Sequence, residues 1–133
     1  MTYYLDTNIC VYFLKGLYPT IVENIKNTSP ANIKIPSIGK AELLYCDEKS
    51  QHKITNLLNI NKLLEPYEII NFDDECAVVY SKIRASLELK GNIIGPNDYI
   101  IAATVLAKNG ILVTNNVKEF KRVKNIKIEN WAE

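Results

Sequence analysis

The sequence predicts an α/β fold of three layers, in which helices flank a mostly parallel central sheet. Short apolar runs, typical of buried strands, alternate along the chain with segments of helical periodicity. The runs Tyr3–Leu5 and Ile111–Val113 each stop at a polar turn, as strands of a parallel sheet do at their carboxyl ends. With 133 residues, of which 47% are hydrophobic, the chain is expected to form one domain over residues 1–133.

The remaining strands are expected to be short. Residues 33–35 alternate in polarity and run into Pro36 and Ser37, which open a helix. Residues 67–72 are rich in strand-forming side chains, although their alternation is imperfect. Ile126 and Ile128 predict an edge strand near the C-terminus.

Helices are expected between these strands, over residues 9–14, 20–27, 38–46, 50–64, 74–90 and 98–107. Asp73 would cap the longest of them, and Gly91 would follow its C-terminus. Gly95 and Pro96 interrupt the chain, and Asn97 is expected to cap the next helix. That helix is apolar on nearly every face, which indicates that other elements enclose it.

Charge, cysteine spacing and hydropathy bear on the partners, the redox state and the location expected of this protein. The formal net charge is +1, so no overall electric field points to a polyanionic partner. Cys10, Cys46 and Cys76 match no zinc or redox spacing, and each is expected to be a reduced thiol in the core. The sequence shows neither a membrane span nor a basic region typical of a signal peptide, which predicts a cytoplasmic protein.

Three acidic side chains stand where a charge is costly. Asp6 follows the first strand, and Thr7 or Asn8 is expected to cap the helix after it. Helical spacing places Glu42 in the middle of a buried stripe, and Asp98 lies in the first turn of the enclosed helix. A carboxylate among apolar side chains costs free energy unless a cation or hydrogen-bond donors compensate it. Taken singly, each acid is also explained as a helix cap or as half of a salt bridge.

Taken together, the three acids predict a metal site. In a parallel sheet, strand ends and helix starts can bring Asp6, Glu42 and Asp98 to one crevice. Carboxylates so close repel one another, and a divalent cation makes their crowding tolerable. Oxygen ligands without a set of His and Cys favour Mg²⁺ or Mn²⁺ over zinc. Such a site suits phosphodiester hydrolysis, because the metal generates hydroxide and neutralises charge on the leaving oxygen.

These residues resemble those of the PIN-domain ribonucleases and, among them, the VapC-type toxins of toxin–antitoxin pairs. The resemblance extends over essentially the whole chain and implies a three-layer PIN-like fold. It rests on short motifs at residues 5–8 (Leu-Asp-Thr-Asn), 41–43 (Ala-Glu-Leu), 95–98 (Gly-Pro-Asn-Asp), 112–116 (Leu-Val-Thr-Asn-Asn), 119–120 (Glu-Phe) and 129–131 (Glu-Asn-Trp). Each motif alone is weak, but their order in a chain of this length is specific.

The resemblance implies an Mg²⁺-dependent endoribonuclease, with Mn²⁺ as the alternative metal, that cuts structured RNA such as tRNA or rRNA. It also implies a homodimer without membrane association. A small VapB-type antitoxin would inhibit the enzyme by placing its C-terminal segment in the groove. Operator DNA would be bound indirectly, through the antitoxin.

Position by position, the resemblance assigns metal binding to Asp6, Glu42 and Asp98. Asn116 occupies the fourth catalytic position, where many relatives carry Asp. A neutral amide adds no charge, so we expect one tightly held metal and a second that binds weakly until RNA supplies ligands. Supporting roles fall to Thr7, Asn8, Asn97 and Thr114. The alternative is a non-catalytic PIN-like module that binds RNA or protein around a degenerate metal site.

Overall fold

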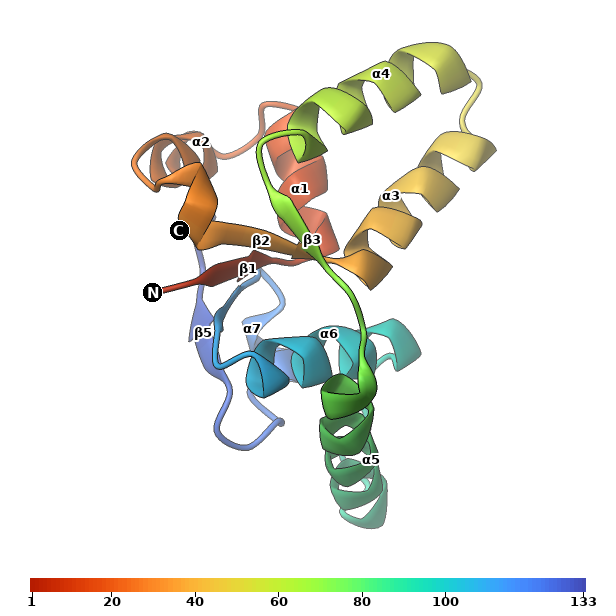
Figure 1. Ribbon diagram of the computed structural model, residues 1–133, viewed down its shortest axis with the longest axis vertical. Coiled ribbons are helices and arrows are strands. Elements are labelled where there is room, and N and C mark those ends of the chain that lie inside the picture. Colours follow the sequence, from red (N-terminus) through yellow and green to blue (C-terminus); the bar gives the residue numbers. More distant parts are fainter.

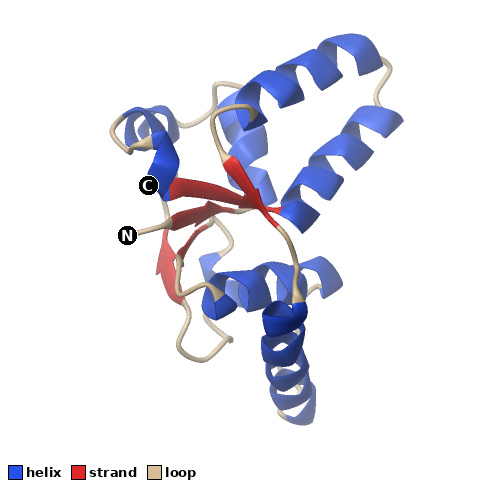
Figure 2. Cartoon of the chain, in the orientation of Figure 1, coloured by secondary structure: helices blue, strands red, loops and turns tan.

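A computed structural model of the chain describes the backbone of residues 1–133 and the side chains of all residues except Ile54 and Thr55. A sheet of parallel strands lies between two groups of helices (Figures 1 and 2). The strands are β1 (Tyr3–Leu5), β2 (Ile33–Pro36), β3 (Glu68–Ile70), β4 (Ile111–Val113) and β5 (Lys127–Glu129). The helices are α1 (Thr7–Leu14), α2 (Pro19–Lys26), α3 (Ser37–Lys49), α4 (Lys53–Leu64), α5 (Asp74–Leu89), α6 (Pro96–Ala107) and α7 (Val117–Phe120), with a 3₁₀ turn, η1 (Pro30–Asn32).

The strand order across the sheet is β3-β2-β1-β4-β5, and every pairing is parallel. The chain adds β2 and β3 on one side of β1, and then β4 and β5 on the other side. The direction of the connections therefore changes between β1 and β4. In open α/β sheets, ligands bind outside the carboxyl ends of the strands at this switch point. The predicted parallel sheet is confirmed, and its topology marks the position of the site.

Helices cover both faces of the sheet, as predicted. In Figure 1, α1 to α4 lie on one face, whereas α5, α6 and α7 lie on the other. Side chains such as Ile9, Ile35 and Leu43 form the core of the first layer. Leu112 and Phe120 belong to the core of the second. Because both faces are buried, β4 is apolar at every position, which explains why its sequence predicted a strand so clearly.

The buried face of α3 differs from the prediction. The helix buries Gly39, Leu43 and Asp47, one turn apart, whereas Glu42 is half-buried. Cys46, predicted to be a core thiol, is exposed, while Cys10 and Cys76 are buried. The reason is that α3 packs against α1 and α4 through the Leu43 face and turns the Glu42 face toward a cavity.

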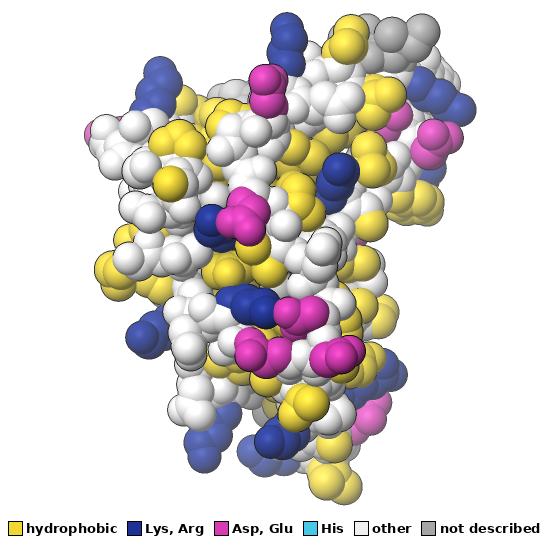
Figure 3. Space-filling view, viewed as in Figure 1, with side chains coloured by type: hydrophobic (Ala, Val, Ile, Leu, Met, Phe, Trp, Pro, Cys, Tyr) yellow, Lys and Arg dark blue, Asp and Glu magenta, His cyan; other side chains and the backbone are white. Residues whose placement is uncertain are grey.

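Two helix starts show how acids and turns set the local structure. Asp73 accepts the Cys76 N–H at 3.0 Å as the N-cap of α5, as predicted. Lys108 lies 2.6 Å from Asp73, and this ion pair holds the pKa of Asp73 well below its usual range. Acidic side chains gather there beside a basic one (Figure 3). For α6, the prediction of Asn97 as the cap is wrong: Gly95 is the N-cap, because Pro96 suits the first helical position.

No helix in the described chain combines the length and the apolar character needed to cross a bilayer.

Candidate active site

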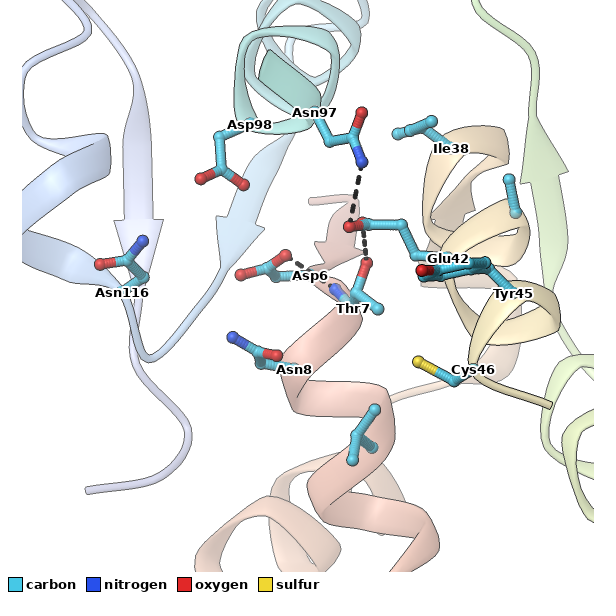
Figure 4. Close-up of a pocket in the computed structure, with 12 residues that line it drawn as sticks. Asp6, Thr7, Asn8, Ile38, Glu42, Tyr45, Cys46, Asn97, Asp98 and Asn116 are labelled. Atoms are coloured by element: carbon cyan, nitrogen blue, oxygen red, sulfur yellow. Dashed lines mark hydrogen bonds between the residues drawn. The ribbon is translucent and has the colours of Figure 1, made fainter. Parts of the chain in front are cut away.

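A cavity of about 500 Å³ opens at the carboxyl ends of β1 and β4. Asp6 lies at its centre, Asp98 reaches it from α6, and Glu42 reaches it from α3 on the opposite side (Figure 4). The structure therefore brings the three predicted acids to one cavity. The other residues that line it are Thr7, Asn8, Val11, Ile38, Ala41, Tyr45, Cys46, Asn97 and Asn116.

Asp6 is fixed at the end of β1 by two donors. Its Oδ1 accepts the Thr7 N–H at 2.7 Å, and its Oδ2 accepts the Thr114 hydroxyl at 2.8 Å. Asp6 is thus itself the N-cap of α1, and the prediction that Thr7 or Asn8 caps this helix is wrong. Only 5% of the residue's surface is exposed, and this burial raises the pKa of Asp6 above its ordinary value.

Thr114 ties the two central strands together at the site. This buried residue follows β4, and its hydroxyl donates to Asp6 while accepting the Asn116 N–H at 2.9 Å. The backbone adds a parallel link, because the Asp6 N–H donates to the Val113 carbonyl at 2.9 Å. The Asp6 carboxylate is therefore held by the sheet itself.

Glu42 is held by neutral groups. Its Oε1 accepts the Thr7 hydroxyl at 2.6 Å, and its Oε2 accepts the Asn97 amide at 3.3 Å (Figure 4). Among the described side chains, no Lys, Arg or His nitrogen lies within 4.0 Å of a carboxylate oxygen of Asp6, Glu42 or Asp98. The salt-bridge explanation of these acids therefore fails where the structure describes them.

Asp98 bears most of the electrostatic cost of the cavity. Burial, followed by the charges of Asp6 and Glu119 and then of Glu42, raises the pKa of Asp98 to about 7. Glu119 behaves in the opposite way, because the Asn116 amide at 2.8 Å and the Gly95 N–H at 2.7 Å donate to it and lower its pKa. In the metal-free chain Asp98 is thus partly protonated near neutral pH while Glu119 stays charged.

Glu119 is the site residue that sequence reasoning missed. It entered that reasoning only as part of the Glu-Phe motif, although it follows Asn116 by three residues, one turn along α7. The Asn116 amide donates to Glu119, so the neutral fourth position is linked to a nearby carboxylate. Asn8 also lines the cavity, on the exposed side of α1.

The donor set fits a hard divalent cation. Carboxylate and amide oxygens converge on the cavity, and burial raises the pKa of Asp6 and of Asp98, so a cation would stabilise their ionised forms. In the conformation seen, however, the described His, Cys, Asp and Glu side chains include no group of three close enough to hold an ion. The acids surround the cavity, and hydrogen bonds from Thr7 and Asn97 keep the Glu42 carboxylate on its α3 side.

Without metal, the chain is expected to lose thermal stability as the pH rises from about 4 to about 7. Asp98 has a folded pKa of about 7 against an ordinary value of 3.8, so its protonated form favours the fold; this contribution is full below 3.8, falls as the pH rises and is gone above about 7. The lowered pKa of Glu119 changes the stability only below pH 4.5, the ordinary pKa of this group, and so does not offset the loss at higher pH.

Thermal denaturation in EDTA across this pH range measures the effect. Excess Mg²⁺ should restore most of the lost stability at high pH, because the ion compensates the ionised acids in the folded chain. A Tm that is independent of pH in EDTA would contradict the charge crowding described above.

Comparisons with known proteins agree with this geometry. The pattern of the PIN domain matches residues 3–126. Ribonuclease VapC2 of Rickettsia felis is 45% identical over 132 residues, which cover 98% of each chain. The tRNA(fMet)-specific endonuclease VapC of Salmonella typhimurium is 34% identical over 132 residues, or 99% of each chain. In the crystal structure of VapBC2 from R. felis bound to a promoter DNA fragment, one chain superposes with a TM-score of 0.93 at 44% identity, covering 98% of this chain and 99% of that one.

Proposed function

This chain belongs to the PIN-domain family, as a ribonuclease toxin of the VapC type, and from that membership we propose that it is an Mg²⁺-dependent endonuclease that cleaves tRNA. The relative from S. typhimurium is named for tRNA(fMet), which makes the initiator tRNA the first substrate to test. The observation that carries the proposal is the convergence of Asp6, Glu42 and Asp98 on one cavity, without a basic partner among the side chains that the structure describes.

Asp6, Glu42 and Asp98 would hold the metal, which supplies an activated water and neutralises charge on the phosphate. The protein's own contribution is positioning. Thr114 and the start of α1 fix Asp6, while Thr7 and Asn97 orient Glu42. Glu119, although close to Asp98, is engaged by backbone and amide donors.

Features at the rim of the cavity support an RNA substrate. Tyr45 is 61% exposed and lines the cavity from α3, one turn beyond Glu42. The Lys49 ammonium lies 5.0 Å from the centre of its ring. An exposed aromatic ring with a neighbouring cation suits an unstacked base and its phosphate, because every base offers a face for stacking. We assign this pair to binding the nucleotide next to the cut.

The partners follow the same reasoning. The structural relative from R. felis is a VapBC2 complex on promoter DNA, which supports a VapB-type antitoxin as the inhibitor of this chain and as its link to operator DNA. Apolar side chains exposed on and after α5, namely Val78, Leu89 and Ile93, offer a surface for a homodimer. An enzyme that cuts tRNA would act in the cytoplasm.

The proposal is tested by incubating the purified chain with initiator and elongator tRNAs in Mg²⁺, in Mn²⁺ and in EDTA. We expect site-specific cleavage of the initiator tRNA with either metal, none in EDTA, and inhibition by the cognate antitoxin. Stable RNA binding without cleavage in Mg²⁺ or Mn²⁺ would instead favour the non-catalytic module.

Asn116→Asp is expected to tighten Mn²⁺ binding, because it adds a carboxylate to the fourth catalytic position. The substitution should also destabilise the metal-free fold. The Asn116 amide now donates to Glu119 at 2.8 Å, whereas a carboxylate at this position would repel Glu119. The metal-free variant should therefore melt at a lower temperature than wild type. Calorimetry that shows unchanged Mn²⁺ affinity would contradict the role assigned to this position.

A further inference from the structure

A second pocket, of about 220 Å³, lies between α1, α3 and α4. Its walls include the apolar side chains of Leu14, Leu43 and Ile60, and the amides of Asn56 and Asn59. We call this space the helical pocket. None of its features is used by the phosphodiester chemistry described above.

The helical pocket contains a buried acid without a partner. Asp47 lines it with only 5% of its surface exposed, and its Oδ1 has no hydrogen-bond partner among the described atoms. No basic nitrogen of the described side chains lies within 4.0 Å of the carboxylate. A buried carboxylate in this state costs free energy that the fold does not recover.

The position of Asp47 on α3 adds to that cost. The helix ends at Lys49, so Asp47 lies in its last turn, where backbone carbonyls already carry partial negative charge. Neither packing nor the helix dipole favours an acid here. A residue that neither packing nor the helix dipole favours is expected to serve a ligand, and the ligand that compensates a buried carboxylate is a cation.

The helical pocket adjoins the catalytic cavity. Val11 and Cys46 line both spaces, and Figure 4 shows Cys46 on the α3 side of the catalytic cavity. A chain segment seated in the helical pocket would therefore approach the entrance to Asp6 and Glu42. Such a segment suits a protein inhibitor, because it would anchor the inhibitor beside the site that the inhibitor blocks.

We infer that Asp47 is a buried anchor for the antitoxin, and that it pairs with a Lys or Arg side chain carried on an otherwise apolar segment of that protein. The inference rests on the proposed function, since it takes the antitoxin as the occupant. The apolar walls receive the stem of the cation, and the amides of Asn56 and Asn59 supply further hydrogen bonds. The pair forms when the partner binds, and this accounts for the uncompensated acid in the free chain.

The test measures antitoxin affinity and thermal stability for Asp47→Asn, with Glu48→Gln as the matched control. Glu48 is the next residue on α3, and its side chain is 73% exposed, so its substitution removes the same charge from the surface. Asp47→Asn should weaken antitoxin binding by at least about tenfold, whereas Glu48→Gln should change it by less than about twofold.

Stability of the free chain separates an anchor from a structural role. Asp47→Asn should raise the Tm of the free chain by about 2–5 °C, because it removes an unpaired buried charge. Its tRNA cleavage should match wild type, since Asp47 does not line the catalytic cavity. Lys15, which lines the helical pocket from α1, is the internal alternative. If Asp47→Asn and Lys15→Met both lower the Tm, the two residues pair within the chain and the inference is overturned.

The partner side is tested by replacing each Lys and Arg of the antitoxin with Met. One of these substitutions should weaken binding to wild type but have little further effect on Asp47→Asn, as a double-mutant cycle requires. If wild-type binding is intact and Asp47→Asn binds equally well, the anchor is overturned while the toxin function stands. If the antitoxin fails to bind or inhibit wild type, the proposed partner itself is wrong.

Discussion

Asp6→Asn is expected to reduce RNA cleavage by more than about a hundredfold. Losing an outer-shell partner of a metal ligand costs about 10- to 100-fold, and Asp6 is itself proposed to be a ligand. Asn is as good an N-cap as Asp, and its carbonyl can still accept the Thr7 N–H, so α1 should form normally. What is lost is a charge at the centre of the cavity. The measurement is the initial rate of tRNA cleavage at saturating Mg²⁺.

The same substitution has an electrostatic signature that a folding defect would not produce. The charge of Asp6 is the largest contribution after burial to the raised pKa of Asp98, so the pKa of Asp98 should fall in the variant. A carboxyl NMR titration of the metal-free chain measures it. Asp74→Asn, in the first turn of α5 and outside the cavity, should leave both the rate and this pKa unchanged. Full activity of Asp6→Asn would refute the site.

Thr114→Val is expected to impair both folding and catalysis. The Asp6 Oδ2 would lose its donor and the Asn116 N–H would lose its acceptor, at one buried and one half-buried position. Each unsatisfied buried group costs about 1–3 kcal/mol, so we expect a loss of about 2–4 kcal/mol in the free energy of unfolding. Cleavage should fall by about 10- to 100-fold, as for other groups that orient a metal ligand.

Thr114→Ser is the matched control, because it keeps the hydroxyl and removes only a methyl group. It should cost about 1 kcal/mol of stability and leave the cleavage rate within a few-fold of wild type. Urea denaturation and initial rates measure the two properties. If the Ser variant is as defective as the Val variant, packing of the methyl group and not the hydrogen bond to Asp6 holds the site together.

Most of the fold follows from local sequence, for a physical reason that β1 and β4 illustrate. Strands buried on both faces must be apolar throughout, and Asp6 and Thr114, although buried, mark where the two apolar runs end. The switch point between these strands then determines which side chains meet. Asp6 and Asp98 could therefore be placed at one cavity before the coordinates were known.

The face of α3 could not be assigned from sequence because two stripes satisfy helical spacing. One stripe runs through Ile38, Glu42 and Tyr45 and the other through Gly39, Leu43 and Asp47; each carries one acid, and the structure buries the second. Periodicity does not predict the burial of an acid without a partner. Glu119 was missed for a related reason, because its orientation depends on the Gly95 N–H, which lies 24 residues away in sequence.

The bond between Thr114 and Asp6 joins residues 108 positions apart, at the centre of the sheet. During synthesis the first of these residues leaves the ribosome long before the second. β4 completes the centre of the sheet beside β1, so the cavity cannot take its final form until almost the whole polypeptide has emerged. A nascent or truncated chain therefore lacks the assembled acidic cavity, so any nuclease activity can begin only when the polypeptide is nearly complete.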